Sequence, residues 1–215
     1  MKKIAMLATA FLTSVAMCFA QTPVKDEAGL KTKMQTAAKS VTSIQSDFVQ
    51  EKYMSAMGNS MKSSGKFYYK KEDKVALQYT VPFKQNMVMN GTKLMMEVNG
   101  KKNVMDASSN PMMGELKKVI SACMSGNIAD MGSNYQLSFF ETDEAYMVKI
   151  VPQSADVKKF ASEVELYLDK KDFSVVKMKM IESLKNGQKK NDYTLYTFTN
   201  KKTNAAIADS VFTIK

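Results

Sequence analysis

The region between residues 44 and 98 constrains the fold most, because its apolar residues alternate with polar ones as they do in β-strands. From Val75 to Val81 every second residue is apolar, which places these residues on one face of an extended strand. Pro82 ends this run, and the pair Asn90-Gly91 has the composition of a tight hairpin turn. The pattern predicts an antiparallel sheet with one apolar and one polar face. Something must cover the apolar face.

Outside this region the chain again reads mostly as β-structure, with two helices. A helix is predicted over residues 26–41, where apolar residues recur at three- and four-residue steps and Asp26 and Glu27 lie near the N-terminus. A second helix is predicted over residues 112–124, with Pro111 near its first turn. The expected strands are 44–55, 63–71, 74–81, 86–90, 93–98, 101–105, 134–140, 145–151, 161–169, 173–182, 190–199 and 209–214.

The sequence contains no repeat, low-complexity tract or linker that would divide it. Residues 21–215 are therefore expected to form a single domain, of a length suited to one hydrophobic core. A dozen short antiparallel strands with two helices predict an α+β, mostly β protein. We expect a strongly curved antiparallel sheet with helices covering its inner face.

The first 20 residues have the features of a secretory signal peptide. A basic start is followed by an apolar run over residues 4–15, and cleavage is expected at Ala20-Gln21. The apolar run is too short for a membrane-spanning helix. A lipoprotein signal with an acylated Cys18 is the alternative, and the bulky Met17 before the cysteine disfavours it. The mature protein is thus expected to be exported and soluble.

The basic residues are all lysines, because the chain has 31 basic residues and no arginine. Without Lys2 and Lys3 of the leader, 29 lysines remain against 21 acids, a net charge of +8. Specific nucleic-acid recognition relies on arginine, so no nucleic-acid partner is expected. The lysines, many of them in pairs, either solvate strand ends and turns or attract anionic headgroups or an acidic partner.

The chain has no histidine, which excludes Ser-His-Asp and Cys-His catalysis and histidine-bound zinc. Cys123 is the one cysteine after the leader, so no internal disulfide is possible, and a buried inert thiol is expected. The acidic cluster of Glu141, Asp143 and Glu144 lacks the spacing of a calcium loop and is expected to be a solvated turn. We predict a protein that is not an enzyme and holds no metal or cofactor.

One ordered series of residues resembles a known family, the LolA family of periplasmic carriers of outer-membrane lipoproteins. The series spans about half of the mature chain without gaps, and a weaker similarity continues to the C-terminus. Its members are Phe48, Gln50, Gly65-x-Phe67, Lys70-Lys71, Pro82, Gln85 and Asn90-Gly91-x-x-Leu94, followed by Ile150-Val151-Pro152, Leu166-Tyr167-Leu168-Asp169 and Asp209-x-x-Phe212.

The resemblance implies an incomplete barrel lidded by helices, with an apolar cavity between sheet and helices. It also implies a periplasmic carrier that binds the acyl chains of lipoproteins and transfers them from the inner to the outer membrane. The implied partners are lipidated proteins, an inner-membrane lipoprotein-releasing transporter and an outer-membrane acceptor, with the carrier itself a monomer. The alternative is an envelope sensor or regulatory lipid-binding protein on the same scaffold. A sequence that stops after one domain favours the carrier.

Methionine is the compositional outlier, with 16 of the 19 residues lying outside the leader. Its flexible, polarizable side chain suits a wall that accepts acyl chains of varying shape, although methionine could equally replace leucine as core filler. The residues expected to line the cavity are Phe67, Tyr69, Lys71, Leu77, Tyr79, Met87, Met89, Met96, Met112, Met113, Leu116, Met178 and Met180.

The chain departs from the family at three positions. Lys71 stands where the family carries an arginine that, by resemblance, hydrogen-bonds the helical lid and keeps the empty form closed. Lysine supplies a point charge rather than a five-donor fork, so a latch here would be weaker or differently built. The alternative is a solvated charge at the end of a strand. Leu77 and Met95 replace tryptophans of the family, so the shape of the family's cavity does not predict the shape of a cavity in this chain.

Overall fold

The computed structural model describes residues 21–71, 74–106, 108, 114, 117–119, 121–123, 128, 131–159 and 161–214. The predicted signal peptide, residues 1–20, lies outside this part, as do Met112, Met113 and Leu116. The strands are β1 (Thr22–Pro23), β2 (Ser43–Met54), β3 (Asn59–Lys70), β4 (Lys74–Val81), β5 (Gln85–Asn90), β6 (Lys93–Val98), β7 (Lys101–Asp106), β8 (Tyr135–Glu141), β9 (Ala145–Pro152), β10 (Glu163–Asp169), β11 (Val175–Ile181) and β12 (Tyr193–Thr203).

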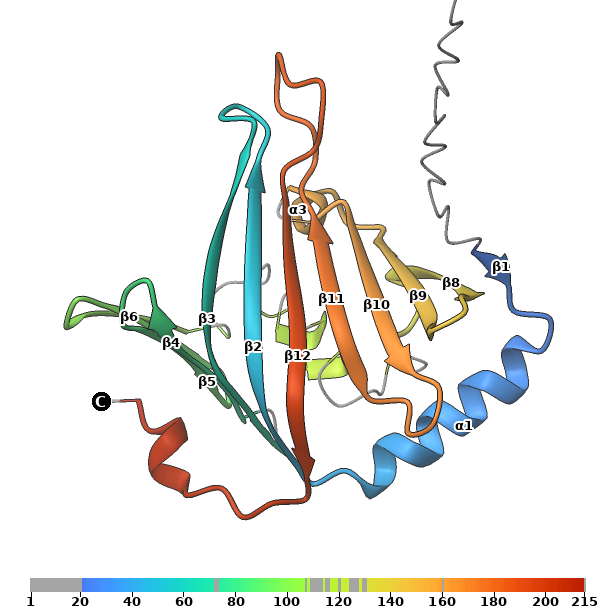
Figure 1. Cartoon of the computed structure of the whole chain (residues 1–215), viewed down its shortest axis with the longest axis horizontal. Coiled ribbons are helices and arrows are strands. Elements are labelled where there is room, and N and C mark those ends of the chain that lie inside the picture. The colour runs from blue at the N-terminus through green and yellow to red at the C-terminus, as the bar shows by residue number, and fades with distance from the viewer. Residues whose placement is uncertain are drawn as a thin grey trace, which may run out of the picture.

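All twelve strands form one antiparallel sheet in the order β1-β8-β9-β10-β11-β12-β2-β3-β4-β5-β6-β7. Most neighbours are joined by hairpins, and the long β12 pairs with β2 to join the two halves of the chain. Figure 1 shows that the sheet is strongly curved. In the strand order, β1 and β7 are the two edge strands. The predicted fold class, a mostly β protein built on a curved antiparallel sheet, is confirmed.

The first predicted helix is α1 (Glu27–Ser40). Asp26 caps its N-terminus, because its Oδ1 accepts a hydrogen bond of 2.8 Å from the amide of Gly29. Leu30, Met34 and Ala38 follow one another at four-residue steps and are the buried residues of the helix. Within the described residues, no helix is long and apolar enough to cross a membrane.

The second predicted helix is described only in part. The structure describes three helical pieces of it, which are Gly114, Lys117–Val119 and Ser121–Cys123. It also describes Ile128. We call the described residues 114, 117–119, 121–123 and 128 the inner segment. Its residues Val119, Cys123 and Ile128 are buried in the main hydrophobic cluster.

The sheet has an inner and an outer face, each with its own hydrophobic cluster. The inner face packs against α1 and the inner segment and carries most of the core. Strand register shows how this face is built: Phe67, Leu77 and Met87 are cross-strand partners on β3, β4 and β5, so they form one row. The smaller cluster lies on the opposite face of β4 to β6 and contains Ala76, Val88 and Met95 together with Phe212.

The predicted strand 209–214 is wrong, because this segment forms the 3-10 helix η2 (Asp209–Phe212). It crosses the outer face of the sheet, where the fully buried Phe212 covers the smaller cluster. Asn90 donates a hydrogen bond from Nδ2 to the Phe212 carbonyl at 3.0 Å, and Lys70 pairs with Asp209. The outer face of β4 to β6 is therefore not wholly polar, and the C-terminus shields it from water. The short β1 and α3 (Ala155–Lys158) were not predicted.

Gly65 of β3 lies close to the backbone of β4. A Cβ atom at this position would be 2.0 Å from the carbonyl oxygen of Gln78 and 2.8 Å from Cα of Tyr79. Gly65 pairs with Phe48 on one side and Tyr79 on the other, and these two rings meet edge to face with centroids 4.9 Å apart. The glycine thus allows two large aromatic side chains to meet across the middle strand.

Replacing Gly65 should therefore be costly for a defined steric reason. We expect Gly65→Ala to lower the free energy of unfolding by roughly 3 kcal/mol or more, because the new methyl group meets fixed backbone. Gly100→Ala is the control: its φ of 77° is strained for alanine, but no atom lies within 4 Å, so the loss should be about 1 kcal/mol. Denaturant unfolding measures both values, and equal losses would contradict this account.

Candidate ligand-binding site

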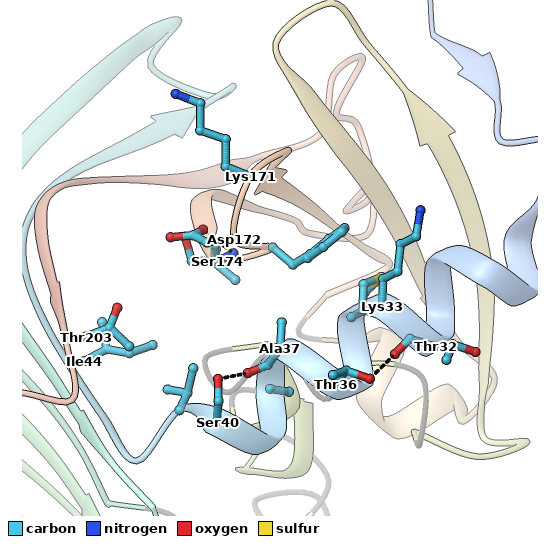
Figure 2. A pocket seen from close by; sticks show the side chains of 15 residues that line it. Thr32, Lys33, Thr36, Ala37, Ser40, Ile44, Lys171, Asp172, Ser174 and Thr203 are labelled. Atoms are coloured by element: carbon cyan, nitrogen blue, oxygen red, sulfur yellow. Dashed lines mark hydrogen bonds between the residues drawn. The ribbon is translucent and has the colours of Figure 1, made fainter.

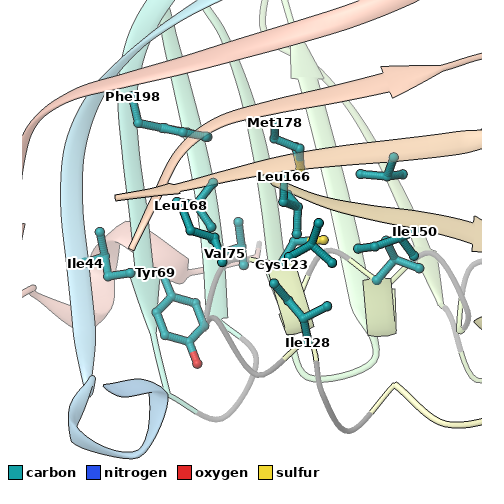
Figure 3. Close-up of a cluster of buried hydrophobic side chains, with 14 of the residues drawn as sticks. Ile44, Tyr69, Val75, Cys123, Ile128, Ile150, Leu166, Leu168, Met178 and Phe198 are labelled. Carbon is teal, nitrogen blue, oxygen red and sulfur yellow. The ribbon is translucent and has the colours of Figure 1, made fainter. Parts of the chain in front are cut away.

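The interior of the curved sheet is filled by the protein's own apolar side chains. Cys123 and Ile128 of the inner segment are fully buried. Figure 3 shows them below Leu166 and Leu168 of β10, which lie on the inner face of the sheet. The inner segment therefore occupies the space that the sheet encloses. Burial of this kind contributes on the order of 2 kcal/mol for each large apolar side chain.

A cavity of about 570 Å³ lies between α1 and the turn that joins β10 to β11. Most of its wall area is apolar, with Met34 and Val41 on the helix side and Phe173 on the turn. Figure 2 shows Lys33 and Lys171 projecting near it from the two sides. The volume is typical of a site for a small organic ligand. The lining residues are Thr32, Lys33, Met34, Thr36, Ala37, Ala38, Ser40, Val41, Ile44, Lys171, Asp172, Phe173, Ser174, Val175 and Thr203.

A buried hydroxyl adjoins this cavity. A second, much smaller cavity shares Ile44 and Val175 with the first and is also bordered by Ser46 and Phe67. Ser46 is only 2% exposed, and its Oγ has no hydrogen-bond partner among the described residues. Such groups are rare in folded proteins, because an unpaired buried polar atom is costly. The Ser46 hydroxyl is thus an unpaired polar group on the inner face, at the border of the smaller cavity.

Three polar side chains, the buried Tyr79 and the half-buried Gln50 and Tyr196, tie β2, β4 and β12 together on the inner face. The Tyr79 hydroxyl donates a hydrogen bond of 2.5 Å to Oε1 of Gln50, and the hydroxyl of Tyr196 lies 3.4 Å from that of Tyr79. Burial raises the pKa of both tyrosines above the usual range, so both hydroxyls stay protonated at neutral pH. The cluster fixes ring positions and supplies no acid or base.

Lys71 lies just beyond β3 and contacts the end of α1. Its Nζ donates a hydrogen bond of 2.8 Å to the carbonyl oxygen of Lys39, in the last turn of the helix. A cation there also interacts favourably with the helix dipole. The backbone amide of Lys71 donates to the carbonyl of Thr42 at 2.8 Å. The neighbouring Lys70 differs, since it pairs with Asp209 on η2.

The predicted cavity residues fall into five groups. Most of the described ones are buried in the inner-face cluster, Met87 and Met180 pack against its border, and Lys71 is exposed at the end of α1. Met96 continues the row of Met87 but is 42% exposed. Met112, Met113 and Leu116 lie outside the described residues. The buried group is Phe67, Tyr69, Leu77, Tyr79, Met89 and Met178.

Sequence reasoning missed much of the wall that the second half of the chain supplies. Val148, Ile150, Leu166 and Leu168 of β9 and β10 are fully buried in the same cluster. Their alternation along each strand was a usable signal, because it separates the two faces of the strand. The cavity beside Phe173 had no comparable signal, since it depends on where α1 packs.

The chain matches a known protein family. The model of the family described as outer membrane lipoprotein carrier protein LolA matches residues 39–215. This is most of the chain, and the protein therefore belongs to the LolA family. The family consists of binding and carrier proteins, periplasmic or exported, rather than enzymes. Among curated protein sequences, none matches this chain.

Solved structures with a similar fold share little sequence with the chain. A LolA superfamily protein from Nitrosomonas europaea is 12% identical, with 86% of this chain and 97% of that chain covered and a TM-score of 0.44. An outer membrane lipoprotein-sorting protein domain from Vibrio parahaemolyticus is 10% identical over 86% and 94%, with a TM-score of 0.46. The MucA/MucB complex of Pseudomonas aeruginosa gives 17% over 88% and 61%, with a TM-score of 0.49. Family membership rests on the family model alone.

The buried thiol of Cys123 gives a direct test of how tightly the inner segment is packed. Burial raises its pKa to about 12, so little thiolate exists at pH 8. A thiol-specific reagent at pH 8 should therefore modify a protein made without residues 1–20 at least roughly 100-fold more slowly than it modifies free cysteine. The same protein in denaturant should react at the ordinary rate. Fast modification of the folded protein would contradict the observed burial.

Proposed function

We propose that this protein is a periplasmic carrier that binds the acyl chains of lipoproteins and transfers them from the inner to the outer membrane. The observation that carries the proposal is the apolar inner face, which is covered by α1 and the inner segment instead of by a second sheet. Membership of the LolA family supports it. The predicted signal peptide would bring the chain to the periplasm.

Acyl chains can replace the protein's own side chains at low net cost. Moving the inner segment aside would expose the apolar surfaces around Val119, Cys123 and Ile128. Each methylene group that enters instead contributes about 0.8 kcal/mol, so a single long chain offsets the loss of several packed side chains. The cavity beside α1 gives such a chain an initial site, and the Ser46 hydroxyl gives an ester or amide carbonyl a donor.

Lys71 would act as a latch on the closed, empty form. Its hydrogen bond to the Lys39 carbonyl holds the C-terminal end of α1 against the sheet. If α1 moves when cargo enters, this contact breaks, and its re-formation favours release. A lysine donates fewer bonds than the family's arginine, so the latch is weak. Loading by an inner-membrane transporter and unloading to an outer-membrane acceptor complete the proposed cycle.

The residue types of the chain support a protein that binds its ligand and does not catalyse a reaction. The chain has no histidine, the buried tyrosines are held neutral, and the thiol of Cys123 is held protonated. None of these groups is prepared to act as a nucleophile or a general base at neutral pH. We therefore infer that the protein acts by holding its ligand.

Ligand entry should be visible at Cys123. A synthetic diacylated lipopeptide should speed alkylation of Cys123 at pH 8 by at least about tenfold, because the inner segment must leave the sheet to admit the chains. The same peptide without acyl chains is the control and should have no effect. Lipopeptide that co-elutes with the protein while alkylation stays slow would show that the ligand binds elsewhere.

The latch is tested by removing the charge of Lys71. Lys71→Leu should keep the fold, because the side chain is exposed. It should slow lipopeptide transfer to acceptor membranes about fivefold, the effect of losing one hydrogen bond of ~1 kcal/mol. Lys70→Leu is the matched control, since its partner is Asp209 on η2 and not α1. Equal transfer rates for the wild type and Lys71→Leu would show that Lys71 is a solvated charge and not a latch.

A further inference from the structure

Large apolar side chains are exposed at the end of the sheet where β4 turns into β5 and β6 turns into β7. Phe83 is 72% exposed, Val81 55% and Val98 42%. Gln85 and Val98 are cross-strand partners, so the two turns lie side by side. Figure 1 shows these strands leaving the rest of the sheet as a wing that ends on the left of the view. We call residues 81–84 and 98–102 the wing tip.

The wing tip is not explained by the packing of the fold. Phe83 belongs to neither hydrophobic cluster, and the two cavities lie beside α1 and under β12. A phenylalanine with this exposure is unusual, because the residue type is among those most often buried. Its place on a turn makes it protrude, so it is suited to enter another phase or surface.

Unpaired lysines surround the exposed apolar side chains. Lys84 follows Phe83 directly, and Lys101 and Lys102 follow the neighbouring turn. All three are exposed, and none forms an ion pair with a described residue. Glu97 is the cross-strand partner of Lys102, but its carboxylate accepts a hydrogen bond from Nδ2 of Asn86 at 3.2 Å. The tip is therefore both apolar and positively charged.

We propose that the wing tip docks onto anionic membrane surfaces, with Phe83 entering the boundary between headgroups and acyl chains. Exposed aromatic and aliphatic side chains together with nearby lysines are the pattern that binds such a boundary. Each lysine near an anionic surface adds attraction that salt screens.

The docking site goes beyond the proposed carrier function, because it needs no cargo. The wing tip and the cavity beside α1 are formed by different strands, so an empty protein should dock as well as a loaded one. For a carrier, docking would bring the open edge of the sheet close to the bilayer that receives the chains. The two activities can be lost separately.

The experiment is sedimentation of the empty mature protein with vesicles. Vesicles of phosphatidylcholine with roughly 30% of the anionic lipid phosphatidylglycerol should bind the protein. Pure phosphatidylcholine vesicles should bind it far less. Binding should fall as salt rises. Phe83→Asp should lower the partition coefficient about tenfold or more, the effect expected for losing one buried phenylalanine. Lys84→Glu should weaken binding mainly at low salt.

Leu184→Asp is the matched control, because Leu184 is 55% exposed on a different turn. It should bind anionic vesicles like the wild type, and all variants should keep their unfolding midpoint. Equal binding by Phe83→Asp and the wild type, or equal loss in Leu184→Asp, would overturn the proposal. The proposal would also be overturned if the wild type did not bind vesicles and Phe83→Asp impaired delivery to a protein acceptor. Lipopeptide retention, measured separately, should be unchanged in Phe83→Asp, so a failed carrier function would be recognised independently.

Discussion

The sheet does not close, and this constraint governs the rest of the structure. Its twelve strands end in two separate edges, so the apolar inner face has no opposing sheet to cover it. Here α1 and the inner segment cover it, chiefly by burying side chains such as Met34, Cys123 and Ile128. Side-chain burial is non-directional, so any apolar material of suitable shape can replace it. In the proposed function, a ligand of acyl chains would compete with the protein's own segments for this surface.

Polar contacts hold both the centre of the sheet and the end of α1 in place. Gln50, Tyr79 and Tyr196 fix the centre of the sheet and keep the wall in place whichever occupant covers it. At the edge of the wall Lys71 holds the end of α1 by one exposed hydrogen bond, which is a weak restraint compared with the burial beneath it. In the proposed cycle, the hydrogen bond of Lys71 would break while the contacts among Gln50, Tyr79 and Tyr196 stay formed, so that the site opens without unfolding.

The sequence predicted the curved sheet because alternation of apolar and polar residues is a local signal, and α1 because its apolar spacing is equally local. It failed where the outcome depends on distant packing. Val211 and Phe212 fit a strand pattern, but the outer face of β4 to β6 binds them as a 3-10 helix. The cavity beside Phe173 arises from the position of α1, and the protruding Phe83 reads in sequence like any turn residue after a proline.

The central claim is that the inner face is built to exchange its own cover for acyl chains. Native mass spectrometry of the mature protein purified from a periplasm tests it most directly, because the spectrum records what the protein holds without any choice of ligand. The account predicts a population whose added mass corresponds to acylated protein or free lipid, released when the protein is denatured. A single species of the bare polypeptide mass, unchanged after incubation with lipopeptide, would contradict it.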